Sequence, residues 1–170
     1  VLVSISFAPI LLSITPTPAF ETTKPMSITE LFSTSPLGCV GMFFLGGIHS
    51  AQFGMAPVFG TQSGLSLSEI SIFVAAFYIG AMVFQFPIGW LSDRMDRRIL
   101  IVAASAIGFI AALSAIVVAD AFLIIVGSAF FIGGMSNPLY SLLIAYTNDF
   151  LELDDMASAS GGLLFLNGLG

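Results

Sequence analysis

Charged side chains are scarce in this sequence. Asp, Glu, Lys and Arg make up 8% of its 170 residues, whereas hydrophobic residues make up 57%. A soluble domain carries about 25% charged residues, so this chain lacks the surface that a water-soluble fold needs. The mean hydropathy of +1.05 points the same way. The composition therefore predicts a protein that lies within a lipid bilayer.

Cysteine, histidine and basic residues are also nearly absent. The chain has one cysteine, Cys39, one histidine, His49, four residues that are Lys or Arg, and a net charge of −6. A single thiol forms no disulfide or thiolate metal site within the chain, and one histidine without a second thiol argues against zinc. Because no basic face is available to neutralise phosphates, we expect no nucleic-acid partner. We also expect no metal and no other cofactor.

What the chain does contain is a series of long apolar stretches. A helix needs about 20 such residues to cross a membrane. Four complete spans are predicted, over residues 37–59, 69–91, 99–119 and 121–147. Residues 1–15 resemble the end of another transmembrane helix, residues 158–170 the first part of a further one, and residues 16–36, rich in Thr, Ser and Pro, a linker outside the membrane. The predicted fold class is an all-α, polytopic transmembrane helix bundle.

Local signals mark where these helices begin and bend. Ser35 is the predicted N-cap of the first span, with Pro36 at its first helical position. Residues 66–69, Ser-Leu-Ser-Glu, have the spacing of a capping box at the start of the second span. Asp120 is a natural N-cap for the fourth span, and Pro57 is expected to kink the far end of the first.

Basic residues cluster at one point in the chain. Three of the four, Arg94, Arg97 and Arg98, lie within five positions between the second and third predicted spans. Short loops rich in Lys and Arg stay on the cytoplasmic side of a membrane. This loop is therefore predicted to be cytoplasmic. Counting crossings from it places the acidic loop 148–156 and the linker 16–36 on the same side.

The arginine loop resembles the signature loop of the major facilitator superfamily of secondary transporters, whose pattern is roughly G-x-L-[SA]-D-R-x-G-R-[RK]. The matching residues are Gly89, Leu91, Ser92, Asp93, Arg94, Arg97 and Arg98. Asp96 departs from the pattern, since the superfamily usually has glycine there. Residues 137–141, 145–149 and 160–164 also resemble a narrower group, the YcaD-like bacterial transporters.

This resemblance implies a twelve-helix carrier that alternates access between two six-helix halves. The chain would supply the end of helix six, the central linker, helices seven to ten and the start of helix eleven, with residues 37–170 as the C-terminal bundle. Because Val1 is not a start methionine and the chain stops within an apolar run, we expect a fragment whose N-terminal half is missing. The alternative placement, in the N-terminal half, leaves no ready position for residues 1–15.

The resemblance also implies a conformational latch at the cytoplasmic side. Asp93 would face a helix N-terminus in the other half, and Gly89 would permit close helix approach. Arg97 would pair with an acid at the end of the fourth span, for which Asp149 is the nearest candidate by topology. Such charge contacts are worth roughly 0.3–2 kcal/mol each. The predicted latch residues are Gly89, Asp93, Arg94, Arg97, Arg98 and Asp149. The simpler alternative is that these charges only set topology, although topology alone does not require Asp93.

Polar side chains at membrane depth form a second group. The predicted cavity-lining residues are His49, Gln52, Gln85, Asn137, Tyr140 and Ser141. Such groups are expected to face a cavity or the bundle interior, and His49 and Gln52, three apart, to share a helix face. Simpler roles are that Gln85 bridges two helices and that Asn137 satisfies a carbonyl freed by Pro138. His49 is either a proton-coupling group or a packing histidine.

These patterns favour a secondary active transporter that moves a small solute across the bacterial inner membrane, coupled to protons or another ion or driven by the solute's own gradient. No GxxxxGK[ST] nucleotide loop is present to supply energy instead. The expected partners are the solute, protons, the lipid bilayer and the missing half. An intramembrane serine protease with Ser136 as nucleophile and His49 as base is an alternative, as is a channel or a non-transporting scaffold. A protease would not explain the arginine loop, so we expect no enzymatic activity.

Overall fold

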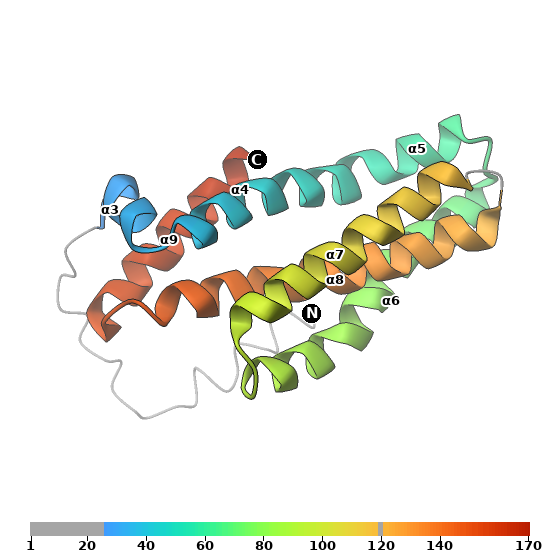
Figure 1. The fold of residues 1–170 in the computed structure, drawn as a ribbon. Coiled ribbons are helices and arrows are strands. Elements are labelled where there is room, and N and C mark those ends of the chain that lie inside the picture. The colour runs from blue at the N-terminus through green and yellow to red at the C-terminus, as the bar shows by residue number, and fades with distance from the viewer. Residues whose placement is uncertain (1–25, 119–120) are drawn as a thin grey trace, which may run out of the picture.

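The structure, a computed structural model, describes residues 26–118 and 121–170. All regular elements in these residues are helical (Figure 1). They are α3 (Ile28–Thr34), α4 (Pro36–Ser50), the π-helical turn η1 (Ala51–Met55), α5 (Ala56–Gln62), α6 (Leu67–Ser92), α7 (Arg97–Val117), α8 (Phe122–Asn148) and α9 (Leu153–Leu169). The predicted all-α class is confirmed. The predicted helix end at residues 1–15 and residues 16–25 of the predicted linker lie outside the described residues.

Four helical segments are long and apolar enough to cross a membrane. They are Pro36–Gln62, Leu67–Ser92, Arg97–Val117 and Phe122–Asn148. The first combines α4, η1 and α5. Two of them continue into the polar residues Gln62 and Asn148, because backbone hydrogen bonding does not stop where an apolar stretch ends. The chain is thus a multi-pass membrane protein.

The helix starts agree only in part with the sequence. The capping box is present, because the Ser66 hydroxyl accepts from the amide of Glu69 and the Glu69 carboxylate accepts from the amide of Ser66. Pro36 lies in the first turn of α4 as predicted. Ser35 occupies the N-cap position of α4 as predicted, but its side chain makes no capping bond. Its backbone also closes α3, and its hydroxyl pairs with that of Thr147 at 3.1 Å.

The N-cap of the fourth span differs from the prediction, which was Asp120. Ala121 occupies the N-cap position of α8, and no side chain caps this end. Asp120 itself lies outside the described residues.

The first span is irregular just before Pro57. Proline has no backbone amide, so the carbonyl of Phe53, four residues earlier, loses its usual helical partner. The turn over Ala51–Met55 is π-helical, a form in which each hydrogen bond reaches one residue further and which bends helices. The π turn therefore lies nearer the middle of the span than the far end, where Pro57 is predicted to kink it.

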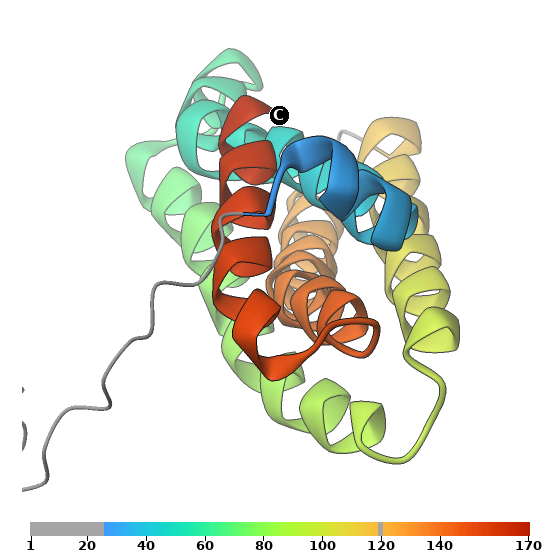
Figure 2. The same ribbon diagram turned by 90° about the vertical axis from the view of Figure 1, so that its left-hand side faces the viewer.

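Helix α8 is the centre of the bundle. Figures 1 and 2 show α6 and α7 lying along it, α4 crossing beside it, and α9 packed on α4. The buried core joins Met42 and Leu45 of α4, Leu143 of α8 and Leu163 of α9. Leu31 of α3 is also buried in this core, so the short helix before the first span is part of the packed bundle.

Glycines close the interface between α6 and α8. A Cβ added at Gly80 would collide with the carbonyl of Phe130, and one at Gly133 would collide with the backbone of Phe77. The obstructing atoms are backbone, so no change of side-chain rotamer relieves the collision. Small residues allow membrane helices to approach this closely.

The interface between α4 and α9 has the same construction. A Cβ at Gly170 would collide with the carbonyl of Phe43, and one at Gly46 would collide with the backbone of Asn167. Each helix again supplies a small residue where the other supplies backbone. The two helix pairs therefore use one type of contact.

An internal repeat underlies these two interfaces. Residues 43–47 read Phe-Phe-Leu-Gly-Gly, and residues 130–134 read Phe-Phe-Ile-Gly-Gly. The first lies on α4 and the second on α8, which run in opposite directions (Figure 1). α4 and α8 are thus equivalent helices of an inverted repeat, and each packs on a helix that follows the other one in sequence.

Candidate functional site

The arginine loop joins three helices at one end of the bundle. Arg97, in the first turn of α7, forms an ion pair with Asp149 at the end of α8. Its Nε donates to the hydroxyl of Ser92, the last residue of α6, at 3.3 Å, and its Nη1 donates to the carbonyl of Ala145 at 3.5 Å. The structure therefore brings together Arg97 and Asp149, which the sequence analysis paired. Their side chains are 27% and 48% exposed, so water screens the pair.

Arg98 turns toward α8 beside this ion pair. Its Nε donates to the hydroxyl of Tyr146 at 3.1 Å, and its guanidinium lies 5.5 Å from the centre of that ring. The amide of Arg98 donates to the carboxylate of Asp96 at 2.8 Å, so Asp96 is the N-cap of α7. The sequence analysis missed the roles of Tyr146 and Asp96. An Asp directly before a helical stretch was the available signal for the second.

The remaining latch residues contact little within the described chain. Arg94 donates to the carbonyl of Trp90 at 3.1 Å and lies 4.0 Å from the centre of the Trp90 ring. Asp93 is exposed at the end of α6. A Cβ at Gly89 would meet nothing within 4 Å. The predicted contacts of Asp93 and Gly89 with another half of the protein stay predictions.

Four aromatic rings from three helical segments lie side by side at membrane depth. We call His49, Phe53, Tyr78 and Tyr140 the aromatic run. The ring of Phe53 in η1 lies 5.6 Å from that of His49 in α4 and 5.9 Å from that of Tyr78 in α6, the second pair being stacked with planes 28° apart. The ring of Tyr140 in α8 lies 6.5 Å from that of His49. Two predicted cavity residues, His49 and Tyr140, are thus brought together.

One polar atom in the aromatic run has no partner. Nε2 of His49 is buried and makes no hydrogen bond within the described part of the chain. A buried polar nitrogen without a partner is unfavourable unless something else satisfies it. Phe53 and Tyr78 are 51% and 57% exposed beside it. The run therefore combines two exposed rings with a buried nitrogen that has no hydrogen-bond partner among the described residues.

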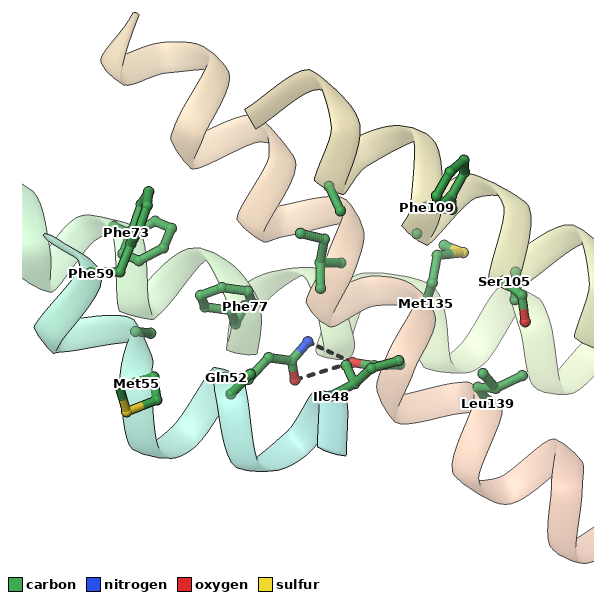
Figure 3. Close-up of a pocket in the computed structure, with 17 residues that line it drawn as sticks. Ile48, Gln52, Met55, Phe59, Phe73, Phe77, Ser105, Phe109, Met135 and Leu139 are labelled. Atoms are coloured by element: carbon green, nitrogen blue, oxygen red, sulfur yellow. Dashed lines mark hydrogen bonds between the residues drawn. The ribbon is translucent and has the colours of Figure 1, made fainter. Parts of the chain in front are cut away.

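Gln52 lies in a different environment from His49. Its side-chain amide exchanges two hydrogen bonds with the Ser136 hydroxyl, at 2.9 and 3.2 Å, and both residues are buried. The pair lines an apolar cavity of about 540 Å³ between the first span, α6, α7 and α8 (Figure 3). His49 and Gln52 both approach α8, at Tyr140 and Ser136, which lie four residues apart and share a face of that helix. The expected common face of His49 and Gln52 stays a prediction, although the π turn that begins at residue 51 changes the helical spacing between them.

The other predicted cavity residues differ in their contacts. Asn137 donates from its side-chain amide to the carbonyl of Gly133 at 3.2 Å. The carbonyl that Pro138 leaves without an amide is that of Gly134, so Asn137 serves the neighbouring carbonyl instead. Gln85 and Ser141 are exposed, and neither side chain makes a hydrogen bond among the residues described. The expected bridge from Gln85 to another helix is therefore not formed within this part of the chain.

The arrangement offers no nucleophile and base in contact. The hydroxyl of Ser136 donates to Gln52 and to the carbonyl of Gly133, and no hydrogen bond joins it to His49 in the described ranges. Nothing here supports the protease alternative. Residues 26–118 and 121–170 also contain no group of three His, Cys, Asp or Glu side chains placed to hold a metal ion.

Comparison with known proteins identifies similar sequences. Residues 24–170 match the sequence model of the Major Facilitator Superfamily. An uncharacterized MFS-type transporter, YfkF of Bacillus subtilis, is 31% identical over 135 residues, which cover 77% of this chain and 34% of that protein. The uncharacterized MFS-type transporter YcaD of Escherichia fergusonii is 26% identical over 149 residues, covering 85% of this chain and 37% of that protein.

YcaD of an Escherichia coli strain, O17:K52:H18, is likewise 26% identical over 143 residues, covering 81% of this chain and 36% of that protein. The chain thus spans about a third of the length of these curated relatives. No solved structure matches it significantly.

Proposed function

We propose, on the premise that this chain belongs to the Major Facilitator Superfamily, that it forms part of a secondary active transporter. The transporter moves a small solute across the bacterial inner membrane by alternating access. The match over residues 24–170 carries this proposal, and the relatives named above are bacterial. The inverted glycine contacts of α4 and α8 support it, since secondary transporters, this superfamily being one of the standard examples, are built from inverted repeats.

The chain corresponds, in this proposal, to the C-terminal half. Residues 37–170 supply one side of the solute cavity, and an N-terminal half of the same polypeptide supplies the other. Residues 16–36 form the cytoplasmic link between the halves. Inward-open and outward-open states then differ by rocking of one half against the other.

The latch acts at the cytoplasmic end of this half. The ion pair of Arg97 and Asp149 ties α7 to α8, while Arg97 also reaches Ser92 at the end of α6. This network keeps the ends of three helices together, so the end of α6 that carries Asp93 and Gly89 is held in a fixed position. Within the described chain the Asp93 side chain makes no hydrogen bond and the space beside Gly89 is open, so both residues can contact the other half. Charge contacts of this kind are weak enough to break in each transport cycle.

His49 is the proposed site of proton coupling. Imidazole is the side chain whose charge changes most readily near neutral pH, and Nε2 of His49 is buried without a partner. Replacement by Gln keeps a hydrogen-bonding group but removes titration. We expect His49→Gln to abolish the pH dependence of solute uptake, and unchanged pH dependence would exclude the role.

The transport proposal is tested with the intact polypeptide in proteoliposomes. The liposomes are exposed to a mixture of metabolites, and the solutes that accumulate are identified by mass spectrometry. A carrier gives uptake that saturates and that is accelerated by the same solute inside. Uptake that rises linearly with concentration indicates a channel, and no uptake of any solute indicates a scaffold. The matched variant is Asp93→Asn, which we expect to slow uptake by altering the latch without touching the cavity.

A further inference from the structure

The apolar cavity beside Gln52 is open at the surface of the bundle. It is lined by the first span, α6, α7 and α8, and two of its lining residues, Met55 and Phe109, are exposed (Figure 3). Its two buried polar side chains, Gln52 and Ser136, bond to each other. Because both polar groups already have partners and most other lining residues are apolar, the cavity suits an apolar occupant.

The internal repeat indicates what kind of occupant this is. α8, the first helix of the second repeat, packs on α6 and α7, which are the second and third helices of the first repeat. α4, the first helix of the first repeat, packs on α9, which is the second helix of the second repeat. In the described ranges α9 is the last helix, so no counterpart of α7 lies against α4. The first span therefore lacks one partner that α8 has.

The exposure of equivalent side chains shows where this partner is missing. Ile48 directly follows the first Phe-Phe-x-Gly-Gly sequence, and Met135 directly follows the second. Met135 is 4% exposed, and a Cβ at Gly108 of α7 would lie 3.8 Å from its Cβ, whereas Ile48 is 41% exposed. Ile48 lines the cavity together with Met55 and Phe59 of the same span, which are also exposed. The face that α7 covers on α8 is thus uncovered on the first span, and it is the face that lines the cavity.

We propose that a further membrane-spanning helix, which follows α9 in the intact polypeptide, fills this cavity and packs on the first span as α7 packs on α8. The chain spans about a third of the length of its relatives, which leaves room for such a helix. α7 brings small residues to the bundle, with Ala104 and Ala111 buried and Gly108 beside Met135. The added helix needs small residues at similar spacing, because Ile48, Met55 and Phe59 already supply large side chains. The cavity is then a packing site and not a solute site.

The test is photo-crosslinking in the intact polypeptide, reconstituted in nanodiscs that hold one copy each. Phe59 is replaced by p-benzoylphenylalanine, an aromatic residue that forms bonds to neighbouring C–H groups when it is illuminated. Mass spectrometry then identifies the crosslinked partner. We expect a peptide that lies C-terminal to Gly170. A crosslink to lipid or to a peptide N-terminal to Val1 would overturn the proposal, and a second copy as the natural occupant would also appear as a crosslink to lipid in these discs.

A second measurement needs no substitution, so it does not depend on folding of a variant. A diazirine dissolved in the bilayer releases a carbene that labels side chains in contact with lipid. Met55 and Ile110 are 59% and 64% exposed in the described chain, but Ile110 does not line the cavity. Relative to the unfolded protein, we expect Met55 to be labelled at least about 5-fold less than Ile110, because close packing excludes the probe.

Two results of this measurement would contradict a packed helix. Equal labelling of Met55 and Ile110 would place lipid in the cavity. Rapid oxidation of Met55 by hydroxyl radicals generated in water would make the cavity a water-filled solute site.

Packing of this helix does not depend on whether the protein transports a solute. The expected crosslink together with no uptake of any solute would reject the carrier proposal and leave the packing standing. Saturable, trans-accelerated uptake together with a crosslink to lipid would do the reverse.

Discussion

Replacing Gly133 by alanine should destabilise the bundle more than its size suggests. The added Cβ would collide with three backbone atoms of Phe77, its carbonyl oxygen, Cα and carbonyl carbon. A side chain could rotate away, but backbone can move only if α6 and α8 separate along their contact. Overpacking of this kind costs about 1–3 kcal/mol. Separation would also disturb the neighbouring contact of Gly80 with Phe130, so we expect the upper part of that range.

A matched control exists on the same helix. A Cβ at Gly127 of α8 would meet nothing within 4 Å. At that position alanine gains about 1 kcal/mol of helix propensity over glycine, so Gly127→Ala should be neutral or stabilising. Both variants replace glycine by alanine on the same helix. The predicted difference between their changes in unfolding free energy therefore reports the backbone contact of Gly133 alone.

The measurement is unfolding of the intact polypeptide in mixed micelles, followed by circular dichroism as denaturing detergent is added. Because the internal repeat predicts an equivalent contact, Gly46→Ala should resemble Gly133→Ala, with Asn167 in the place of Phe77. If Gly133→Ala unfolds at the same detergent fraction as Gly127→Ala, the close backbone contact does not exist in the membrane protein, and the reasoning from it is refuted.

Two further predictions concern side-chain pairs. A double-mutant cycle with Arg97→Gln and Asp149→Asn should give a coupling energy below about 1 kcal/mol in the same unfolding assay, because both side chains are part-exposed. A coupling energy of several kcal/mol would contradict a reversible contact. Gln52→Ala should destabilise by about 1–3 kcal/mol, because it leaves the buried Ser136 hydroxyl with only its own helix carbonyl. The double variant Gln52→Ala, Ser136→Ala should then be more stable than Gln52→Ala alone, and a further loss would show that the pair is not coupled.

The fold class can be predicted well from the sequence because the length of each apolar stretch is a local property that needs no knowledge of tertiary contacts. Apolar length alone identifies four helices, and the capping box at Ser66 is a local pattern that needs no tertiary context. The pairing of Arg97 with Asp149 also follows from topology, since both residues lie at the same end of adjacent helices.

Features that depend on contacts between distant helices are harder to predict. Ser35 occupies the predicted N-cap position, yet its hydroxyl pairs with that of Thr147 in α8 instead of capping the helix. Gln52 and His49 look like neighbours on a regular helix, yet the π turn gives them different surroundings. The contact between the rings of Phe53 and Tyr78 was not predicted, because nothing local shows which aromatic residues of two different helices meet. The missed signal was the repeated Phe-Phe-x-Gly-Gly sequence at residues 43–47 and 130–134, which identifies α4 and α8 as equivalent.

In each repeat the first helix packs on a helix of the other repeat, α4 on α9 and α8 on α6. This arrangement affects the order in which this half is assembled. Gly46 enters the membrane with α4, but the backbone it fits against, at Asn167, is synthesised only with α9. Gly80 of α6 likewise waits for Phe130 of α8. The early helices must therefore stay in the bilayer without their closest partners while the rest of the chain is translated. Insertion of each helix is local, but packing is delayed until the second repeat arrives, so a ribosome that stalls between α7 and α8 leaves inserted helices with none of these glycine contacts made.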